Sequence, residues 1–236
     1  MSQRDLTLME KIMSPGTQDA LMLYDHGMAL QPLARLPEAL DRLQRSADTA
    51  RTQKDVPVIP RAELSVVQVL LAGGQTDRAR QRFGQRQADW DDIVQRQLAG
   101  AVEVWRTQAL LAAAAGQLAP ARALLEQAAA FAQARSGPEH AERLSLELDL
   151  GELALLAGSP QEAAAHAARA QAAARRAALD VMRSADIGRA LWLQARAEAA
   201  QQQAAAGTSA RAALAHLEPT LGSGHPLVAA ARLAAR

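Results

Sequence analysis

The run Asp89-Trp90-Asp91-Asp92 is the tightest cluster of side chains that could do acid–base chemistry. Paired carboxylates of this kind can take part in general acid–base catalysis. Acidic residues are also favoured in the first turn of a helix, where the helix dipole is positive. We interpret the run as the start of a helix, which Trp90 anchors against its neighbour.

The five histidines could bind a metal ion if the chain grouped them. None of them forms a His-x-x-x-His pair or lies beside a carboxylate at metal-ligand spacing. His140 and His225 fall in turns rich in glycine and proline, so we expect them to stabilise these turns. We expect His166 and His216 to be solvated on helices, and His26 to be partly buried. The histidines therefore predict no metal site.

The sequence lacks the other common catalytic and cofactor motifs. Gly73-Gly74 has no strand before it and no lysine after it, so it does not fit a phosphate-binding loop. The chain has no cysteine, which excludes disulfides and thiolate metal sites. We expect no enzymatic activity and no cofactor.

The charge of the chain is almost balanced, with a formal net charge of +1. A basic run of Arg169, Arg175 and Arg176 is interpreted as a solvated helix face, because nucleic-acid binding would need a wider basic stripe with aromatic side chains. No segment is long and apolar enough to span a membrane. We expect no nucleic-acid partner and no membrane insertion, while a homo-oligomer stays open.

The N-terminal segment has no apolar core of the kind that a signal peptide needs. The expected compartment is the cytoplasm. It would be the periplasm if the chain were the distal part of a membrane-anchored kinase.

The elements that position these side chains are predicted to be helices. Hydrophobic residues make up 49% of the chain but aromatic residues only 3%, and alanine dominates. Alanine is the best helix former, and its small side chain lets helices approach closely. The composition indicates an all-α protein.

An internal repeat organises the helices. Four alanines follow short turns at spacings of 40, 42 and 42 residues: Ala39, Ala79, Ala121 and Ala163. Small residues lie 12 positions before each of them: Gly27, Val67, Ala109 and Gly151. Three of the turns carry a matched glycine, which suits a left-handed helix cap: Gly74, Gly116 and Gly158. Each unit is therefore predicted to be a helix pair, with turns near 34–37, 73–76, 116–119 and 158–160.

A less regular fifth pair is expected after these four. Its helices should cover about 182–205 and 209–221, with a turn near 206–208 at Gly207 and Thr208. We expect a capping helix at 226–236 and an N-terminal cap segment within 1–18. The similar turns 136–140 and 222–226, which are 85 residues apart, re-aim the chain between pairs. The whole chain, 1–236, is predicted to be a single domain.

The 42-residue unit resembles tetratricopeptide repeats of the kinesin-light-chain-like type. The turn from Gly222 to His225-Pro226 matches a Gly-x-x-His-Pro-like turn of that family, and Trp105 and Phe83 fall where the repeat favours aromatics. The resemblance covers about 20–236. It implies a right-handed α-solenoid of about five antiparallel helix pairs. In bacteria such regions are often part of serine/threonine kinases and transcriptional regulators.

A partner-binding groove is expected along the first helix of each pair, where residues fall on one face at helical spacing. The groove residues of the first two units are Tyr24, Met28, Gln31, Arg61, Leu64, Gln68 and Leu71. Those of the third and fourth are Glu103, Arg106, Leu110, Ser145, Leu148, Glu152 and Leu155. A mixed polar and apolar row suits a peptide. The alternative is that the solenoid curls tightly and these residues pack inside it.

These observations predict a protein- or peptide-binding module that acts as a scaffold or adaptor. A sensory or regulatory region of a larger bacterial signalling protein is the alternative, and an enzyme is a third. Within the groove, Arg106 and Tyr24 are expected to contribute more to binding than Arg175 or Arg176.

Overall fold

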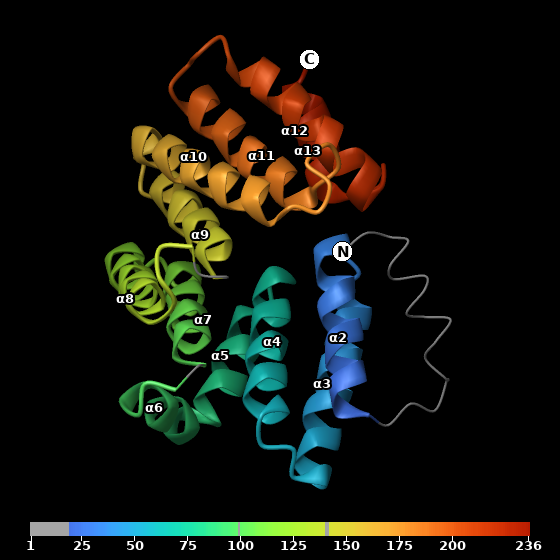
Figure 1. Ribbon diagram of the computed structural model, residues 1–236, viewed down its shortest axis with the longest axis vertical. Helices are drawn as coiled ribbons and strands as arrows, with labels where there is room; N and C mark the ends of the chain where they lie inside the picture. The colour runs from blue at the N-terminus through green and yellow to red at the C-terminus, as the bar shows by residue number, and fades with distance from the viewer. Residues whose placement is uncertain (1–18, 99, 140–141) are drawn as a thin grey trace. The chain divides into compact units, whose positions relative to one another are not determined.

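The computed structural model describes residues 19–98, 100–139 and 142–236, and every regular element within them is a helix. The predicted all-α class is confirmed. The chain divides into two compact units, 1–116 and 117–236, and each is described by itself (Figure 1). The cap segment predicted within 1–18 lies outside the described residues.

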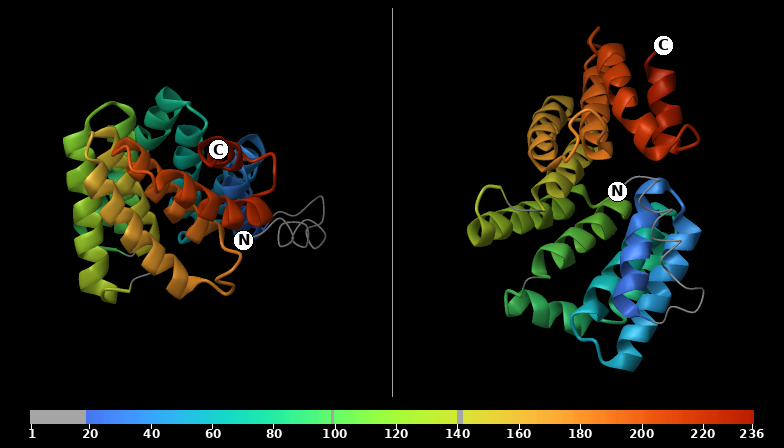
Figure 2. Two further views of the ribbon diagram at one scale, coloured as in Figure 1. Left: turned by 90° about the horizontal axis from the view of Figure 1, so that it is seen from above. Right: turned by 45° about the vertical axis from the view of Figure 1, so that its right-hand side comes forward.

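The first unit contains two helix pairs, a short additional helix and the first helix of a third pair. Its elements are α2 (Ala20–Leu30), the 3-10 turn η1 (Gln31–Leu33), α3 (Leu36–Gln53), α4 (Val58–Ala72), α5 (Thr76–Gly84), α6 (Gln87–Gln95) and α7 (Ala101–Ala114). Helix α2 packs against α3, and α4 packs against α3, α5 and α7. Figures 1 and 2 both show α2, α3 and α4 side by side.

The second unit continues the same plan. Its helices are α8 (Leu118–Ser136), α9 (Arg143–Leu156), α10 (Pro160–Ala177), α11 (Ala185–Ala200), α12 (Ala206–Leu221) and α13 (Pro226–Ala234). Each of the helices from α9 to α12 packs against the next one in the chain. The last helix, α13, falls within the segment predicted as a cap and packs on α12.

The repeated alanines lie at the centres of the helix pairs. Their side chains are all 0% exposed: Ala39, Ala79, Ala121 and Ala163. In the turn before each alanine, a residue in the left-handed conformation ends the preceding helix. This conformation lets the amides of the turn donate to the last carbonyls of that helix. Gly74, Gly116 and Gly158 adopt φ values of +71°, +76° and +72°, and Ala34 takes this role in the first pair with φ 57°. The first four predicted turns are confirmed.

The predicted turn of the fifth pair is wrong. Helix α11 ends at Ala200, and the left-handed residue is Gln202, with φ 56°. The amide of Gln203 then donates to the carbonyl of Glu198 at 2.9 Å. Helix α12 begins at Ala206, so Gly207 and Thr208 lie inside it. A glycine marks a turn only where the backbone needs φ > 0, and in this pair a glutamine meets that need.

The second helix of the second pair is broken into α5 and α6. The chain turns at Gln85 and Arg86, and Trp90 of α6 folds back with only 1% of its side chain exposed. The Trp90 ring stacks on Phe83 with centroids 5.6 Å apart, and its Nε1 donates to the Phe83 carbonyl at 3.0 Å. The interpretation of residues 89–92 as a helix start anchored by Trp90 is confirmed, since α6 begins at Gln87.

The two similar glycine-rich turns share one backbone conformation. Gly137 ends α8 with φ 80°, and Gly222 ends α12 with φ 88°. After the second of these turns, Nδ1 of His225 accepts a hydrogen bond from the amide of Leu227 at 3.1 Å and caps α13. The turn-stabilising role predicted for His225 is confirmed, and His140 lies outside the described residues.

His166 is buried, so the prediction that it is solvated is wrong. Its Nδ1 lies 2.7 Å from a carboxylate oxygen of Glu147 on α9, and Arg169 Nε lies 2.9 Å from the same oxygen. Burial would raise the pKa of Glu147, but hydrogen bonds from His166 and Arg169 bring it below its usual value. His166 is buried because Gly151 of α9 has no side chain, which lets α10 approach closely. A Cβ atom at Gly151 would lie only 3.2 Å from His166 Cβ.

His216 is also less solvated than predicted, because its Nδ1 atom is buried on α12. Burial lowers the pKa of His216 below 6.5, and the charge of Arg175 lowers it further, against a smaller opposing effect of Asp180. The neutral ring is therefore favoured in the folded state.

This lowered pKa gives a pH dependence with a definite sign. The unfolded chain binds a proton at His216 more readily than the folded chain does. The contribution of the neutral ring to the free energy of unfolding is therefore complete above about pH 6.5. It is lost as the pH falls from there through the lower pKa of the folded state. We expect the free energy of unfolding to fall more steeply between pH 7.5 and 5.5 in the wild type than in His216→Gln. Urea unfolding at three pH values measures both slopes, and equal slopes would contradict the assignment.

None of the described helices combines the length and the apolar character that crossing a bilayer requires.

Candidate functional site

The first helices of the pairs in the first unit lie in succession, because α4 packs against both α2 and α7. Their neighbouring faces carry the side chains predicted to line a groove. Seven of these side chains are partly exposed, and Arg61 is exposed; the seven are Tyr24, Met28, Gln31, Leu71, Glu103, Arg106 and Leu110. The predicted row therefore forms a surface of this unit, with two members, Leu64 and Gln68, buried beneath it.

A pocket of about 370 Å³ opens on this surface. Five predicted groove residues line it: Gln31 from η1, Gln68 and Leu71 from α4, and Arg106 and Leu110 from α7. Ala72 and Ala114 complete its wall. The pocket thus combines an apolar lining of leucine and alanine with an arginine and two amides.

A short chain of polar side chains fixes the pocket by tying α4 to α7. The Gln68 amide nitrogen donates to Glu103 at 3.1 Å and to the Thr107 hydroxyl at 3.0 Å. Arg106 donates to the same Glu103 carboxylate oxygen at 3.2 Å. Because Gln68 and Thr107 are buried, these bonds satisfy groups that would otherwise be costly to desolvate. They orient the Arg106 side chain at the pocket.

Tyr24 has a structural role beside any role in binding. Its ring packs against the core cluster of Ala20, Ala47 and Ala50. Burial raises the pKa of its hydroxyl, although a hydrogen bond with Ser65 opposes that rise. Replacement by alanine would therefore remove core packing as well as a surface group, and Tyr24→Phe is the better probe of binding.

The remaining predicted residues of the first unit differ in how accessible they are. Met28 is partly exposed on α2, and Arg61 is exposed in the first turn of α4. Leu64 is 2% exposed and packs in the core, so it supports the surface from below. Leu64 lies about one helical turn after Arg61, on a side of α4 that packs against the neighbouring helices.

In the second unit, the predicted residues run along α9. Ser145, Leu148, Glu152 and Leu155 are all partly exposed. Glu152 accepts hydrogen bonds from Arg196 of α11 at 2.5 and 2.7 Å. Leu155 packs against the small core cluster of Ala154, Ala163 and Ala197. The α9 and α11 faces are therefore joined by an ion pair, as α4 and α7 are joined through Gln68.

The side chains that could have done other chemistry are engaged in local structure. Asp89 pairs with Arg86 at 2.7 Å, and Asp92 pairs with Arg96 at 3.2 Å. Asp91 accepts a hydrogen bond from Gln87 at 2.8 Å. Within the described part of the chain, no three histidine or acidic side chains are grouped so that they could hold a metal ion.

Comparisons with solved structures identify the fold. A "putative kinesin light chain" from Podosopora anserina, with nearly identical TPR-like repeats, has a variant that matches with a TM-score of 0.55 and 20% identity, over 83% of this chain and 92% of that one. A second structure of that protein matches with a TM-score of 0.53 and 20% identity, over 81% of this chain and 91% of that one. BtubC (BKLC) from P. vanneervenii matches with a TM-score of 0.58 and 14% identity, over 87% of this chain and 83% of that one. No protein-family model and no curated protein matches the sequence.

The chain has a TPR-like helical-repeat fold. At these identities the likeness shows the fold alone. The predicted α-solenoid of antiparallel helix pairs is confirmed, and so is the resemblance to kinesin-light-chain-like repeats at the level of the fold.

The prediction from sequence missed four side chains that belong to these TPR-like surfaces. Ala114 lies one helical turn beyond Leu110, so extending the groove pattern by four residues would have found it. Ala72 and Thr107 carry no signal that separates them from neighbouring residues. Arg196 was missed because the fifth pair was assigned no groove residues.

Proposed function

We propose that the chain is a non-catalytic helical-repeat module that binds a protein or peptide segment, as a scaffold or adaptor does. The pocket of about 370 Å³ between η1, α4 and α7 is the observation that carries this proposal. Helical repeats use such surfaces between stacked helices for binding, and TPR-like structural neighbours support this class of function.

The lining of the pocket suits a peptide with one apolar anchor side chain. Leu71 and Leu110 offer an apolar contact, and burying an anchor of leucine size contributes about 2 kcal/mol. Arg106 and Gln31 can hydrogen-bond to carbonyl or carboxylate groups beside that anchor. Anchors that fill pockets next to an arginine are typical of residues that dominate binding energy.

A second candidate function is a sensory region of a larger signalling protein. The pocket volume falls within the range of about 300–1,000 Å³ that is common for small-molecule sites. A small ligand would stabilise the chain against heat, and this stabilisation would grow with the logarithm of the ligand concentration once that concentration exceeds the Kd. A thermal-shift screen of metabolites tests this reading, with Leu110→Glu as the variant that should lose the shift.

Selection of peptides from a random display library tests the main proposal. Peptides enriched on the wild type are measured again by fluorescence anisotropy against Leu110→Glu, which places a charge in the apolar lining. We expect binding to weaken at least tenfold, because the apolar contact of Leu110 is lost and a charged carboxylate must be desolvated when an apolar anchor enters the pocket. Arg106→Gln should weaken binding by about 2 kcal/mol.

Leu156→Glu is the matched control, because Leu156 is 65% exposed at the end of α9, outside the pocket. This variant should bind the selected peptides as the wild type does. Equal binding by Leu110→Glu and the wild type would show that the pocket is not the binding site.

A further inference from the structure

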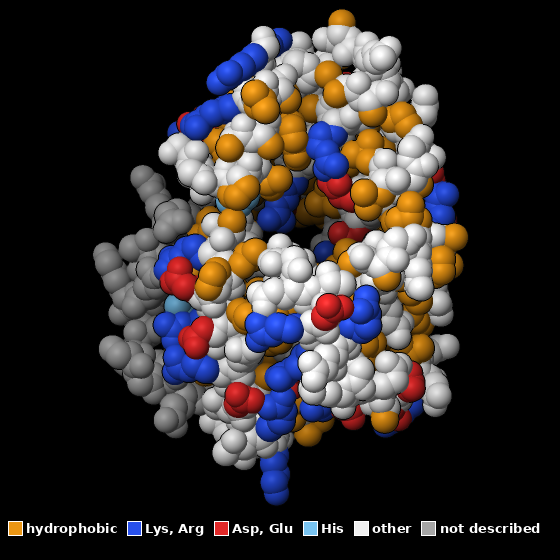
Figure 3. Space-filling model, turned by 180° about the vertical axis from the view of Figure 1, so that it is seen from behind, with side chains coloured by type: hydrophobic (Ala, Val, Ile, Leu, Met, Phe, Trp, Pro, Cys, Tyr) orange, Lys and Arg blue, Asp and Glu red, His pale blue; other side chains and the backbone are white. Residues whose placement is uncertain are grey.

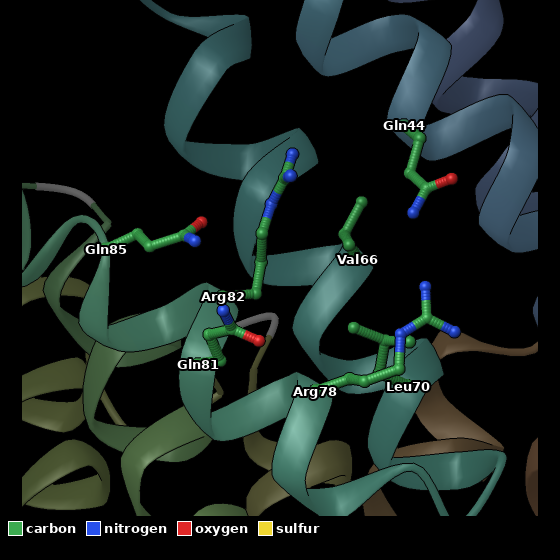
Figure 4. A pocket seen from close by; sticks show the side chains of 7 residues that line it. All are labelled: Gln44, Val66, Leu70, Arg78, Gln81, Arg82 and Gln85. Atoms are coloured by element: carbon green, nitrogen blue, oxygen red, sulfur yellow. The ribbon is translucent and has the colours of Figure 1, made fainter.

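A second, more polar pocket lies in the first unit, where α3, α4 and α5 meet. It has a volume of about 160 Å³ and is lined by the polar side chains of Gln44, Arg78, Gln81, Arg82 and Gln85. Val66 and Leu70 of α4 form its apolar part. Figure 4 shows that Gln44 of α3 faces Arg78 of α5 across the pocket, while Gln81 and Arg82 follow along α5 and Gln85 comes directly after that helix.

The two arginines of this pocket differ in how their charge is balanced. Arg82 donates to the buried carboxylate of Glu63 at 2.8 Å. Arg78 donates to the neutral amide of Gln75, and no carboxylate among the described residues lies within ion-pair distance of it. Arg78 therefore brings an unbalanced guanidinium to a pocket whose other polar groups are amides.

The helices around this pocket carry a surplus of positive charge. Segments 35–54 and 76–86, which include α3 and α5, hold nine basic and four acidic residues, whereas the whole chain holds 26 and 25. The part of Figure 3 that the first unit occupies shows Lys and Arg side chains together with fewer Asp and Glu side chains. The near-neutral chain thus carries a local surplus of positive charge on the helices around this pocket, which attracts anionic partners.

We propose that this pocket, which we call the Arg78 pocket, binds a carboxylate side chain of an acidic peptide segment. An arginine guanidinium presents a planar fork of donors that matches a carboxylate. The amides of Gln44, Gln81 and Gln85 can donate to the same group. The surrounding positive charge then attracts the further acidic residues of the segment.

The size and the chemistry of the pocket favour a carboxylate over other anions. A volume of about 160 Å³ is below the range of small-molecule sites, so it admits one small group. One unbalanced guanidinium matches the single charge of a carboxylate better than the double charge of a phosphate monoester. A nucleic acid would need aromatic side chains on which its bases could stack, and the lining contains none.

This site is separate from the pocket of the proposed function. Val66 and Gln68 are two residues apart on α4, which places them about 200° apart around the helix. The Arg78 pocket uses Val66 and Leu70, whereas the first pocket uses Gln68 and Leu71. The two pockets can therefore be tested independently.

The test measures binding of a fluorescein-labelled octaglutamate peptide to the full chain by anisotropy, at 50 and 150 mM salt. A glycine–serine peptide of the same length is the control probe. We expect octaglutamate to bind and to bind more weakly at higher salt, since surface charges are screened. Absence of binding at 50 mM salt would overturn the proposal.

Matched arginine variants then locate the site. Arg78→Gln should weaken binding at least tenfold, and Arg78→Lys should weaken it several-fold, because lysine lacks the planar fork. Arg80→Gln is the control, since Arg80 lies on the same helix, pairs with Asp77 and does not line the pocket. It should change binding less than twofold. Equal losses in Arg78→Gln and Arg80→Gln would overturn the proposal in favour of a diffuse charge effect.

Three further probes test the class of partner. A phosphoserine peptide, an octauridine RNA and phosphatidylserine vesicles are each measured against the wild type and Arg78→Gln. Tighter binding by any of these than by octaglutamate, with loss in Arg78→Gln, would overturn the acidic-peptide assignment. Leu110→Glu should bind octaglutamate as the wild type does, so failure of the first pocket and failure of the Arg78 pocket give different results.

Discussion

Replacing Arg51 and Arg82 together by glutamine should lower the free energy of unfolding by about 3 kcal/mol. Both arginines bind the carboxylate of Glu63, which is only 1% exposed on α4. Arg51 reaches one carboxylate oxygen, and Arg82 donates to the other at 2.8 Å. Removing both partners leaves a buried charge without compensation, which typically costs about 3–5 kcal/mol. We expect the lower end because the arginines are 38% and 27% exposed.

The single replacements should each cost less, because one guanidinium still neutralises Glu63. Adding Glu63→Gln to the double variant should recover part of the lost stability, since no charge then remains buried. This recovery separates the electrostatic effect from lost arginine packing. A double-mutant cycle between Glu63 and the arginine pair gives the coupling free energy.

Urea unfolding followed by far-UV circular dichroism measures these differences. The control is Arg45→Gln with Arg80→Gln, whose partners Asp41 and Asp77 are 61% and 97% exposed. Exposed ion pairs contribute about 0–1 kcal/mol each, so the control should change little. If the control costs as much as the Arg51 and Arg82 pair, or if Glu63→Gln lowers stability further, the buried-charge explanation is wrong.

The sequence predicted the repeat well where the backbone itself imposes the residue type. Gly74, Gly116 and Gly158 stand at left-handed helix ends, a conformation that glycine adopts at low cost. The repeated alanines lie where two helices cross and where larger side chains do not fit. These local requirements recur in each unit, so a spacing of about 42 residues is enough to find them.

The features that sequence reasoning missed depend on contacts between side chains of different helices. Burial of Glu63 needs Arg51 and Arg82 from two other helices, and no local pattern indicates that they meet. His166 is buried because Gly151 on α9 brings the two helices together. The turn at Gln202 was missed because glutamine seldom adopts a left-handed conformation, whereas Gly207 nearby offered a stronger but misleading signal.

The candidate groove was predictable in outline because first-helix residues recur at helical spacing. That spacing placed Gln31, Gln68, Leu71, Arg106 and Leu110 around one pocket. The Arg78 pocket was not predicted, because its polar lining comes from α3 and α5, the second helices of their pairs, whereas the candidate residues were taken from the first helices. Only the packing of α3 against α4, and of α4 against α5, brings its lining together.

Replacing Gly27 by leucine should lower the free energy of unfolding by about 3 kcal/mol. A Cβ atom at this position would lie 2.5 Å from Leu43 Cγ and 3.3 Å from the Ala39 carbonyl oxygen. Leu43 is 0% exposed, so it has no space into which it can move. Overpacking of this kind costs about 1–3 kcal/mol, and a side chain of leucine size belongs at the upper end. Gly27→Ala should cost less, because alanine adds only the Cβ atom to the crowded crossing, while its better helix propensity offsets about 1 kcal/mol.

Gly84→Leu is the matched control for this prediction. Gly84 is also helical, its φ is not positive, and no atom lies within 4 Å of a Cβ built there. The control should be neutral or stabilise the chain by up to about 1 kcal/mol, since leucine forms helices better than glycine. Leu43→Ala, placed on Gly27→Leu, should restore stability by making room. Chemical denaturation of the single variants and of the double variant measures these changes in the free energy of unfolding. Additive losses from Gly27→Leu and Leu43→Ala would mean that the two side chains do not compete for one space, and that the close crossing of α2 and α3 does not require glycine.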